Sequence, residues 1–481
     1  MRKKLAGGLL ATAMVTALMA GCGKKTTTPQ TAPKQEEVKQ EAEVVDEVTE
    51  EEIDDTPKAA PERVTVSDDG MVLNILCWND KLIKSVTDYY PDYEKKDDIT
   101  GKIGDVEVHW IVISQKDDAY ENELDIVLPG NVDALPEDKI DLFFVEADDA
   151  SKYANSYYTL EVVNDIGVAE ALLDNQYPYT KDIMTDVNGA LRGVTWQGNP
   201  GVMVYRRDIA KRVWGTDDPE EIQSHFGGWE DFYAAADELK AKGYQITATV
   251  HDTYRVYSNN VSSKWVKDGK INIDSQMQDW ALHSKELVEN GCTSTDKLQS
   301  DSWKKGLETN SKVFCYFLPE GLMASKMNEG EKGMAATDGL YAAIKGPQSF
   351  FWGGTWLCGA DGTDNISLVR DIMEKMTTDE TILTNMAKTD EKFVNNRNVM
   401  EDMAENASYK SELLGGQNAI VTFCESADAI FSQYLSQYDE ECNKEFQAAM
   451  RKWFDGKYAS YDEAVEAFYA KVIEKYPELT K

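Results

Sequence analysis

Positive charge is scarce in this chain of 481 residues, which carries 50 Lys and Arg against 86 Asp and Glu, a formal net charge of −36. It also lacks any basic patch interleaved with aromatic residues. Phosphate backbones repel so negative a protein, so the composition excludes nucleic-acid binding. Anionic lipid surfaces should repel it as well, so charge alone would not hold it at a membrane.

Motifs for catalysis and metal binding are absent too. The chain contains no GxSxG, no HExxH, no phosphate-binding glycine loop and only four dispersed histidines. We therefore expect no metal, no cofactor and no enzymatic activity. An exported glycosidase stays open as an alternative, because it needs only two carboxyl groups roughly 5–10 Å apart. A lipoprotein adhesin or scaffold is a further functional class that the sequence leaves open.

The cysteines form neither a CxxC pair nor zinc-binding spacing. Several lie in apolar runs such as LNILCW and GGTWLCGA, where a free cysteine behaves as a small buried hydrophobe. One or two disulfides remain compatible with an exported protein, but no pair is favoured. Apart from Cys22, the cysteines are Cys77, Cys292, Cys315, Cys358, Cys424 and Cys442.

The N-terminus is typical of an export signal. It reads MRKKLAGGLLATAMVTALMAGCGKK, a positive start followed by an apolar stretch over 5–20. That stretch is shorter than the roughly 18–20 residues that span a bilayer, and it ends in small residues. The last residues before Cys22 resemble a lipobox, with Met19 where Leu is most usual. We predict a lipoprotein signal peptide over 1–21 and an acylated, palmitate-bearing Cys22. An ordinary signal peptide with an unused cysteine is the alternative.

Aromatic residues are absent until Trp78. The segment that follows the signal peptide is dominated by Thr, Pro, Glu, Asp and Ala, and it cannot bury enough apolar surface to offset its ordering entropy. We therefore predict a lipidated cysteine and a disordered acidic tether over 22–70. Loss of the signal peptide would take the net charge from −36 to −39, because it removes three positive residues.

The remaining chain, 71–481, is longer than the roughly 250–300 residues that one hydrophobic core usually serves, so two lobes are expected. Strand and helix patterns alternate along it, which predicts an α/β fold. The expected strands are MVLNILCW, VEVHWIVI and IDLFFVE, and the expected helices are WEDFYAAADELKAKG, SLVRDIMEKM and SYDEAVEAFYAKVIEKY, the last opened by a Ser460…Glu463 capping box.

Several segments, taken in order, resemble a known family. They are LNILCWND, IDLFFVEADDASKYANSYYTLEVV, NGALRGVTWQGNPGVMVYRRDIAKR, WEDFYAAADELKAKGY and FFWGGTWLCGADGTDNISLVRDIMEKMTTDE. The order is similar to that of the lipid-anchored solute-binding proteins of ABC importers, in the sugar-binding class that includes maltose-binding protein. Ile140 and Thr195 stand where the family usually has proline.

The resemblance implies a two-lobed, periplasmic-binding-protein-like fold with a ligand cleft between the lobes. Lobe 1 would take 71–190 and 336–395, and lobe 2 would take 191–335 and 396–481. It also implies an extracytoplasmic monomer that is anchored to the bacterial membrane through its acyl chain. This protein would carry a small carbohydrate to the transmembrane subunits of a permease. Peptides and polyamines are alternative ligands.

A sugar presents hydroxyl groups on its edge and C–H patches on its faces, so its site needs aromatic platforms with Asp, Asn, Glu or Arg. In open α/β sheets such sites lie beyond the carboxyl ends of strands. By resemblance, Asp148 matches a ligand-contacting Asp, Asn199 lies where the family has Glu, and Tyr254 keeps an aromatic. The predicted ligand-binding residues are Trp78, Asn79, Asp80, Asp148, Trp196, Asn199, Tyr254, Glu320, Trp352, Gly353 and Trp356.

The stretch FFWGGTW, residues 350–356, concentrates aromatic residues around two glycines. We expect it on a strand that returns to the first lobe close to the cleft, where the glycines allow close approach to the backbone. In a regular strand Trp352, Gly354 and Trp356 would face the same side. We expect Trp352 to reach the ligand and Phe350 not to.

Overall fold

The computed structural model describes residues 66–327, 330–389 and 392–481. The predicted signal peptide, the lipidated Cys22 and most of the tether lie outside these ranges. The end of the predicted tether, 66–70, is held against 363–367: Gly70 N–H donates to the Asp364 carbonyl at 2.8 Å, and Ile366 N–H donates to the Ser67 carbonyl at 3.2 Å.

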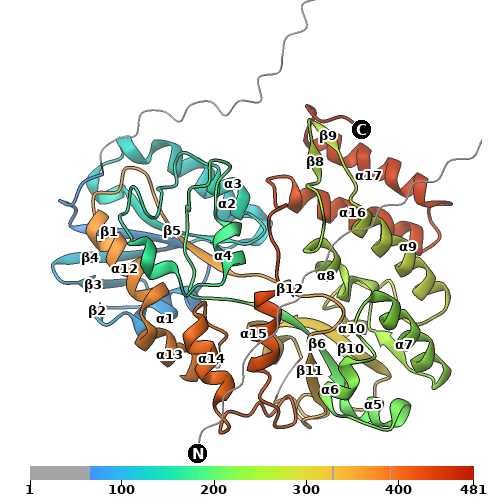
Figure 1. Ribbon diagram of the computed structural model, residues 1–481. Helices are drawn as coiled ribbons and strands as arrows, with labels where there is room; N and C mark the ends of the chain where they lie inside the picture. The colour runs from blue at the N-terminus through green and yellow to red at the C-terminus, as the bar shows by residue number, and fades with distance from the viewer. Residues whose placement is uncertain (1–65, 328–329, 390–391) are drawn as a thin grey trace, which may run out of the picture. The chain divides into compact units, whose positions relative to one another are not determined.

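The first sheet has six strands in the order β13-β5-β1-β4-β3-β2 (Figure 1). β1 runs parallel to both of its neighbours, whereas β13 pairs antiparallel with β5. The three strands expected near the start of the body are therefore present and adjacent. The strands are β1 (Val72–Cys77), β2 (Tyr93–Lys95), β3 (Thr100–Ile103), β4 (Val106–Val112), β5 (Ile140–Glu146) and β13 (Thr355–Gly359).

The second sheet follows the order β11-β6-β10-β7, with β12 also paired to β6. Two of its strands, β11 and β12, come from the range 336–395 that the prediction assigned to lobe 1. The lobe division itself stays a prediction. The strands are β6 (Pro200–Arg206), β7 (Gln245–Thr247), β10 (Val313–Pro319), β11 (Tyr341–Ile344) and β12 (Phe350–Phe351), and a separate pair is β8 (Val266–Lys267) with β9 (Lys270–Ile271).

Seventeen α-helices occur in the described part of the chain, and the expected α/β class is confirmed. They are α1 (Asp80–Tyr89), α2 (Ala119–Val127), α3 (Ala150–Ala154), α4 (Pro178–Ile183), α5 (Arg207–Trp214), α6 (Pro219–Gln223), α7 (Trp229–Ala241), α8 (Tyr254–Ser258), α9 (Ser275–Glu289), α10 (Asp301–Lys305), α11 (Glu320–Lys326), α12 (Ile366–Thr378), α13 (Glu380–Thr389), α14 (Arg397–Glu405), α15 (Ile420–Asp428), α16 (Asp439–Phe454) and α17 (Tyr461–Lys475). Of these, α7, α12 and α17 are the three expected from periodicity. No helix in the described ranges has the length and apolar character needed to cross a membrane.

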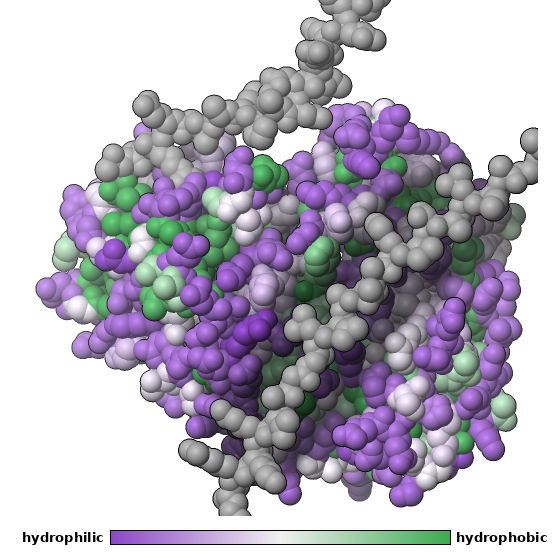
Figure 2. All heavy atoms as spheres, viewed as in Figure 1, coloured by the Kyte–Doolittle hydropathy of each residue, from purple (hydrophilic) through white to green (hydrophobic). Residues whose placement is uncertain are grey.

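Both faces of the second sheet are buried, and alternate residues of β6 serve different cores. Val202 and Val204 belong to a core shared with the first sheet, whereas Met203 and Tyr205 belong to a core under α7. This is the period of two that a strand imposes on its side chains. A third core joins α9, α16 and α17. Figure 2 shows mostly hydrophilic residues on the face in view, as expected for a chain with 28% charged residues.

The six cysteines in the described ranges are free, and five of them are buried. Burial raises the pKa of the Cys77 thiol to about 12, a shift that a backbone hydrogen bond with Asn79 does not reverse. These cysteines therefore pack as small apolar side chains, as their surroundings in the sequence predicted.

Candidate ligand-binding site

Two segments carry the chain between the sheets. The first runs from Val194, which pairs with Leu357 of β13, to the start of β6 at Pro200. The second is the short connection 352–354 between β12 and β13. The two touch, since Trp352 N–H donates to the Asn199 carbonyl at 3.3 Å. We call these two segments the crossing segments.

A third segment, 393–395, lies against the first crossing segment. Gly198 N–H donates to the Phe393 carbonyl at 3.0 Å, and Asn395 N–H donates to the Trp196 carbonyl at 2.9 Å. The Asn395 side chain is completely buried and donates to the Thr195 carbonyl at 3.0 Å. The backbone between the sheets is thus fixed by its own hydrogen bonds.

The glycines of FFWGGTW break the strand. Gly353 has φ +70° and Gly354 has φ +120°, both in the left-handed region that glycine tolerates. A Cβ at Gly354 would lie 2.9 Å from the Trp356 ring. Because β12 and β13 are separated here, the alternation that a regular strand would give residues 352–356 does not apply.

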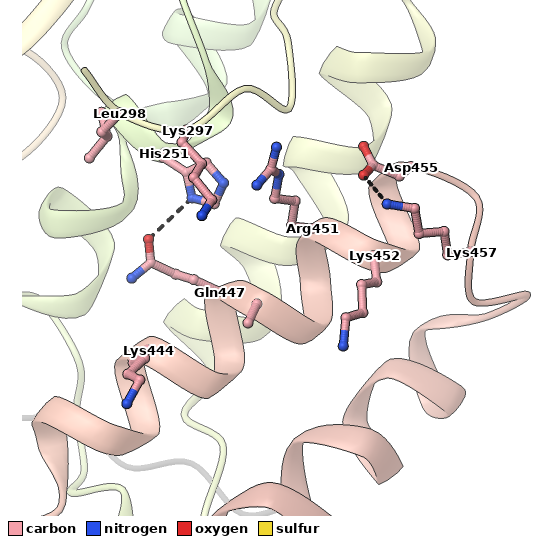
Figure 3. Close-up of a pocket in the computed structure, with 10 residues that line it drawn as sticks. His251, Lys297, Leu298, Lys444, Gln447, Arg451, Lys452, Asp455 and Lys457 are labelled. Carbon is pink, nitrogen blue, oxygen red and sulfur yellow. Dashed lines mark hydrogen bonds and ion pairs between the residues drawn. The ribbon is translucent and has the colours of Figure 1, made fainter. Parts of the chain in front are cut away.

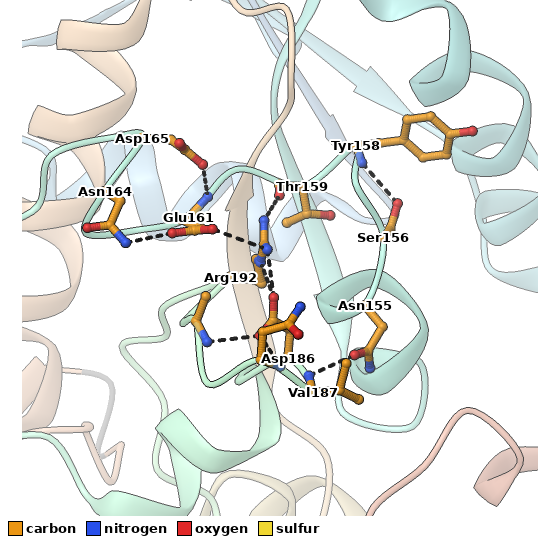
Figure 4. A network of polar contacts seen from close by, with 12 residues as sticks. Asn155, Ser156, Tyr158, Thr159, Glu161, Asn164, Asp165, Asp186, Val187 and Arg192 are labelled. Carbon is orange, nitrogen blue, oxygen red and sulfur yellow. Dashed lines mark hydrogen bonds and ion pairs between the residues drawn. The ribbon is translucent and has the colours of Figure 1, made fainter. Parts of the chain in front are cut away.

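A polar network fixes the loop that precedes the first crossing segment (Figure 4). The guanidinium of Arg192 donates from Nε and Nη2 to Asp186 Oδ2, at 2.9 and 2.6 Å, and from Nη1 to the Thr159 carbonyl at 2.9 Å. Arg192 and Asp186 are each 7% exposed. Burial alone would raise the pKa of Asp186, but the backbone N–H of Ala190 and the Arg192 guanidinium outweigh it and lower that pKa.

A narrow polar cavity lies at the carboxyl end of β5, next to the crossing segments. Its charged centre is an ion pair in which Arg255 donates to both oxygens of Asp148, at 2.6 and 2.5 Å. Hydroxyl and amide side chains surround the pair. The lining residues are Ala147, Asp148, Ser151, Arg255, Ser258, Asn259, Phe351, Leu435, Ser436, Asp439 and Asn443.

Electrostatics keep this ion pair charged. Burial would raise the pKa of Asp148, but the Arg255 guanidinium outweighs it and lowers that pKa. Asp439 lies nearby, and no cation in the described ranges forms an ion pair with it. Burial raises its pKa to about 7 although the Ser436 hydroxyl and N–H donate to it. The cavity therefore offers both a fixed charge pair and a carboxyl group that titrates near neutral pH.

A wider cavity of about 600 Å³ adjoins the narrow one, and Asp148 lines both. Carboxylates dominate it: Asp118, Glu121, Asp125, Glu146, Asp148, Asp149, Glu440, Glu441 and Glu478, with three lysines. Burial and then the Glu440 charge raise the pKa of Asp149 to about 7. We call this the acidic cavity. Its oxygens are acceptors suited to the hydroxyl or ammonium groups of a ligand.

The predicted site residues that follow the first strand do not line either cavity. Trp78 is half-buried, with its ring 5.2 Å from Tyr120 in an edge contact. Asn79 caps α1, where its side chain accepts from the N–H groups of Lys81 and Leu82 at 2.9 and 3.1 Å. Asp80 is the exposed first residue of that helix.

Three predicted aromatic residues are inside the protein. Trp196 is 1% exposed, its ring packs edge-on against Phe144 at 5.9 Å, and its Nε1 has no hydrogen-bond partner in the described ranges. Trp356 is 2% exposed and donates to the Thr180 carbonyl at 2.9 Å. Tyr254 is 2% exposed and donates to Asn443 Oδ1 at 2.7 Å. In this conformation a ligand has almost no surface of these rings to contact.

The other predicted residues lie at or near the crossing segments. Asn199 has φ +51°, and its amide donates to Gln197 Oε1 at 3.3 Å. Glu320 accepts from the Phe393 N–H at 2.9 Å. Trp352 and Gly353 are partly exposed, beside Phe351 of the narrow cavity, whereas Phe350 is fully buried.

Sequence reasoning missed Arg255, Asp439 and Asn443, which line the narrow cavity together with the predicted Asp148. Arg255 directly follows the predicted Tyr254, and this position next to a predicted site residue is the only feature of the sequence that could have pointed to it. Asp439 and Asn443 lie on the first turns of α16, nearly 300 residues after Asp148 in the chain. No local pattern marks residues that only the tertiary fold brings together.

We expect the free energy of unfolding of the protein to depend on pH through Asp252. This buried side chain accepts a hydrogen bond from Trp303 Nε1 at 2.8 Å. Burial raises the pKa of Asp252 to about 7, above its ordinary value of 3.8. The native state then holds this proton more tightly than the unfolded chain, so the group's contribution to the free energy of unfolding falls as pH rises toward 7. From pH 6 to pH 8 that loss is about 1 kcal/mol.

Urea unfolding of the wild type and of Asp252→Asn at pH 6 and pH 8 checks this expectation. The variant should lose less stability than the wild type over this interval, by about 1 kcal/mol. An equal pH dependence in the two proteins would contradict a native-state pKa near 7 for this group.

Comparison with known proteins gave no matching family model and no match among curated proteins. Solved structures do match. An extracellular solute-binding protein of family 1 aligns with a TM-score of 0.68 at 16% identity, covering 84% of this chain and 99% of that one. This chain has the fold of the extracellular solute-binding proteins. The fold expected from the sequence is thereby confirmed.

Other matches to the solute-binding-protein fold carry sugar-binding descriptions. The sugar-binding protein MalE of the phytopathogen Xanthomonas citri aligns with a TM-score of 0.64 at 12% identity, covering 84% of this chain and 98% of that one. The galacto-N-biose-/lacto-N-biose I-binding protein of a Bifidobacterium longum ABC transporter aligns with a TM-score of 0.61 at 14% identity, covering 86% and 100%.

Proposed function

We propose that this protein binds a sugar or oligosaccharide reversibly and delivers it to an ABC permease without changing it chemically. The observation that carries the proposal is the site at the carboxyl end of β5, where the narrow cavity of about 20 Å³ adjoins the acidic cavity of about 600 Å³ and Asp148 lines both. Only the wider cavity has room for a sugar ring, and the narrow one adds hydroxyl, amide and charged side chains beside the crossing segments. The sugar-binding descriptions of two proteins with the same fold support this ligand class.

The Asp148–Arg255 pair gives this site a way to recognise hydroxyl groups. Asp148 can only accept hydrogen bonds and Arg255 can only donate them, so a hydroxyl beside the pair can donate to Asp148 and accept from Arg255. Asn259 and Asn443 add amide groups to the same cavity. We propose Asp148, Arg255, Asn259 and Asn443 as polar ligand contacts, with Trp352 as the aromatic platform.

For the other predicted site residues we propose indirect roles. Trp78, Asn79 and Asp80 would contact a ligand only through a wider opening of the site. The buried Trp196, Tyr254 and Trp356 would support the cavity walls. Asn199, Glu320 and Gly353 would act where the crossing segments bend.

The cellular setting is also part of the proposal. The sequence patterns support export through the signal peptide 1–21, an acyl chain on Cys22 and a tether up to residue 70. The folded body would work as an extracytoplasmic monomer, with lobe 1 from 71–190 and 336–395 and lobe 2 from 191–335 and 396–481. The permease subunits would be its protein partners.

A cationic ligand, such as a polyamine or a basic peptide, is a second candidate because of the nine carboxylates around the acidic cavity. Ammonium groups would relieve the carboxylate repulsion that, together with burial, raises the pKa of Asp149. Titration with spermidine and with a Lys-rich peptide, beside the sugar panel, separates the two ligand classes. Hydrolysis of a glycoside that a single carboxylate substitution abolishes would instead favour the glycosidase alternative.

Trp352→Ala is expected to weaken sugar binding by about tenfold, since stacking of a planar group on an aromatic ring is worth about 1–3 kcal/mol. Because Trp352 is half-buried and packs against two of the hydrophobic cores, the variant is also expected to lose some stability while staying folded. Calorimetry with the best sugar of the panel measures the affinity, and thermal melting checks the fold.

Trp453→Ala is the matched control, because Trp453 packs on Tyr461 at 5.6 Å, and none of the cavities described above includes it. Its affinity should equal that of the wild type. Trp196→Ala, in contrast, should lower the free energy of unfolding by about 3–5 kcal/mol, as expected for a buried tryptophan. Unchanged affinity in Trp352→Ala would remove Trp352 from the site.

A further inference from the structure

A cavity of about 630 Å³ beside the second half of α16 is lined mainly by cationic side chains (Figure 3). Its charged lining residues are Lys297, Lys444, Arg451, Lys452, Lys457 and Asp455. Five cations thus face one carboxylate in a chain whose net charge is −36. We call this the basic cavity. Gathering like charges in the wall of one cavity is electrostatically unfavourable, because the charges repel one another.

The carboxylate of the basic cavity is already engaged. Asp455 accepts from the Thr295 hydroxyl at 2.6 Å and forms an ion pair with Lys457 at 3.2 Å. Lys444 pairs with Glu441 at 3.1 Å. In the described ranges, Lys297, Arg451 and Lys452 have no carboxylate within ion-pair distance.

Arg451 is held in place while its terminal nitrogens stay available. Its Nε donates to the Thr295 carbonyl at 2.8 Å, and the part of the chain that the structure describes contains no hydrogen bond from Nη1 or Nη2. A guanidinium fixed in this way presents a planar donor pair that matches the oxygens of phosphate or sulfate. Lys297 and Lys452 add point charges without a fixed direction.

His251 forms part of the wall between Lys297 and Gln447 (Figure 3). It is 8% exposed, and its Nδ1 lies 3.1 Å from Gln447 Oε1. Burial lowers the pKa of His251 to about 4, with the nearby Arg451 charge acting in the same direction. An anion bound beside this ring would favour its protonated form, so His251 is an internal reporter of occupancy.

We propose that the basic cavity is an anion site that binds a phosphate or sulfate group, either as the free ion or carried on a sugar. A volume of about 630 Å³ falls within the range of small-molecule sites, so the cavity has room for a sugar attached to the anion. Lys444 lines both this cavity and the acidic cavity, so the anion site adjoins the acidic cavity along α16. The anion site does not depend on what the narrow cavity binds.

Calorimetry with inorganic phosphate, inorganic sulfate, a hexose 6-phosphate and the same unmodified hexose tests the proposal in wild-type protein. The Lys297→Gln/Lys452→Gln double variant removes two charges that no carboxylate neutralises, so anion affinity should fall about tenfold or more. Lys242→Gln/Lys267→Gln removes the same charge from two exposed positions outside the cavity and should bind as the wild type does. Thermal melting of the three proteins confirms that they are folded.

The outcomes distinguish the two sources of the anion. Tighter binding of the hexose 6-phosphate than of phosphate identifies an anionic sugar, whereas equal affinities identify the free ion, and both support the site. In either case the pKa of His251, followed by NMR, should rise at saturation. Absence of binding at millimolar anion, or equal affinity in the double variant and its control, would overturn the proposal. The affinity for unmodified sugars would remain a separate test of the proposed function.

Discussion

Asp148→Asn is expected to reduce sugar affinity by about 10- to 100-fold, because hydrogen bonds to a charged group contribute about 1.5–3 kcal/mol each. The substitution keeps the size of the side chain but removes its charge and one of its two acceptor oxygens. It also leaves the Arg255 guanidinium without the partner that now accepts from it at 2.6 and 2.5 Å. Calorimetry with the best sugar of the panel measures the loss.

Asp92→Asn is the control for this substitution. Asp92 also pairs with a cation, Lys375, at 2.7 Å, but its side chain is 59% exposed, against 38% for that of Asp148, and none of the described cavities includes it. Exposed ion pairs contribute little, so both affinity and stability should stay close to those of the wild type. Wild-type affinity in Asp148→Asn would exclude Asp148 from the site.

Arg192→Met is expected to lower the free energy of unfolding by about 3–5 kcal/mol, because it leaves the buried Asp186 charge without its partner. Asp186 is 7% exposed and accepts from Arg192 at 2.6 Å, and the same guanidinium holds the Thr159 carbonyl. The loop ahead of the first crossing segment would lose its main anchor. Urea unfolding of the purified protein measures the effect.

Two further variants separate charge burial from general damage. Arg212→Met breaks a surface pair with Asp208 at 3.5 Å, in which Arg212 is 63% exposed, and should cost less than about 1 kcal/mol. Arg192→Met/Asp186→Leu removes both buried charges and should recover part of the lost stability. Equal stabilities of Arg192→Met and Arg212→Met would contradict the account of this network.

The sequence predicted the regular elements well because their periodicity is a local property. The apolar run before Trp78 became β1, and IDLFFVE became β5, which pairs with β1 on one side and with β13 on the other. The segment SLVRDIMEKM became part of α12, and its apolar residues from Val369 to Met376 recur at helical spacing and are buried. In each case the spacing of the apolar residues is set within one strand or one helix, so the pattern is visible in the sequence.

Side-chain exposure near the crossing segments was not predictable in the same way. Trp196 follows a short polar loop in the sequence, yet the packing of Phe144 and the backbone of Asn395 leave it 1% exposed. The position of Asp148 at a strand end was visible, but its partner Arg255 lies more than 100 residues away. Long-range contacts of this kind carry no local signal.

The FFWGGTW cluster, residues 350–356, contains one prediction that the structure agrees with and one that it contradicts. Its glycines were expected where the chain returns to the first sheet, and β13 does begin at Thr355. The alternation inferred for a regular strand failed, because positive φ angles at Gly353 and Gly354 interrupt it. Sequence indicates that two adjacent glycines are permissive, but only the fold shows that both adopt the left-handed region.

One measurement tests the central claim most directly: calorimetry of the folded protein against a panel of mono- and oligosaccharides, followed by chromatography of the recovered ligand. The account predicts saturable binding of at least one sugar class, with the ligand recovered unchanged. The account would be contradicted if no sugar of the panel bound while spermidine or a basic peptide did. Recovery of a hydrolysed sugar would contradict it as well.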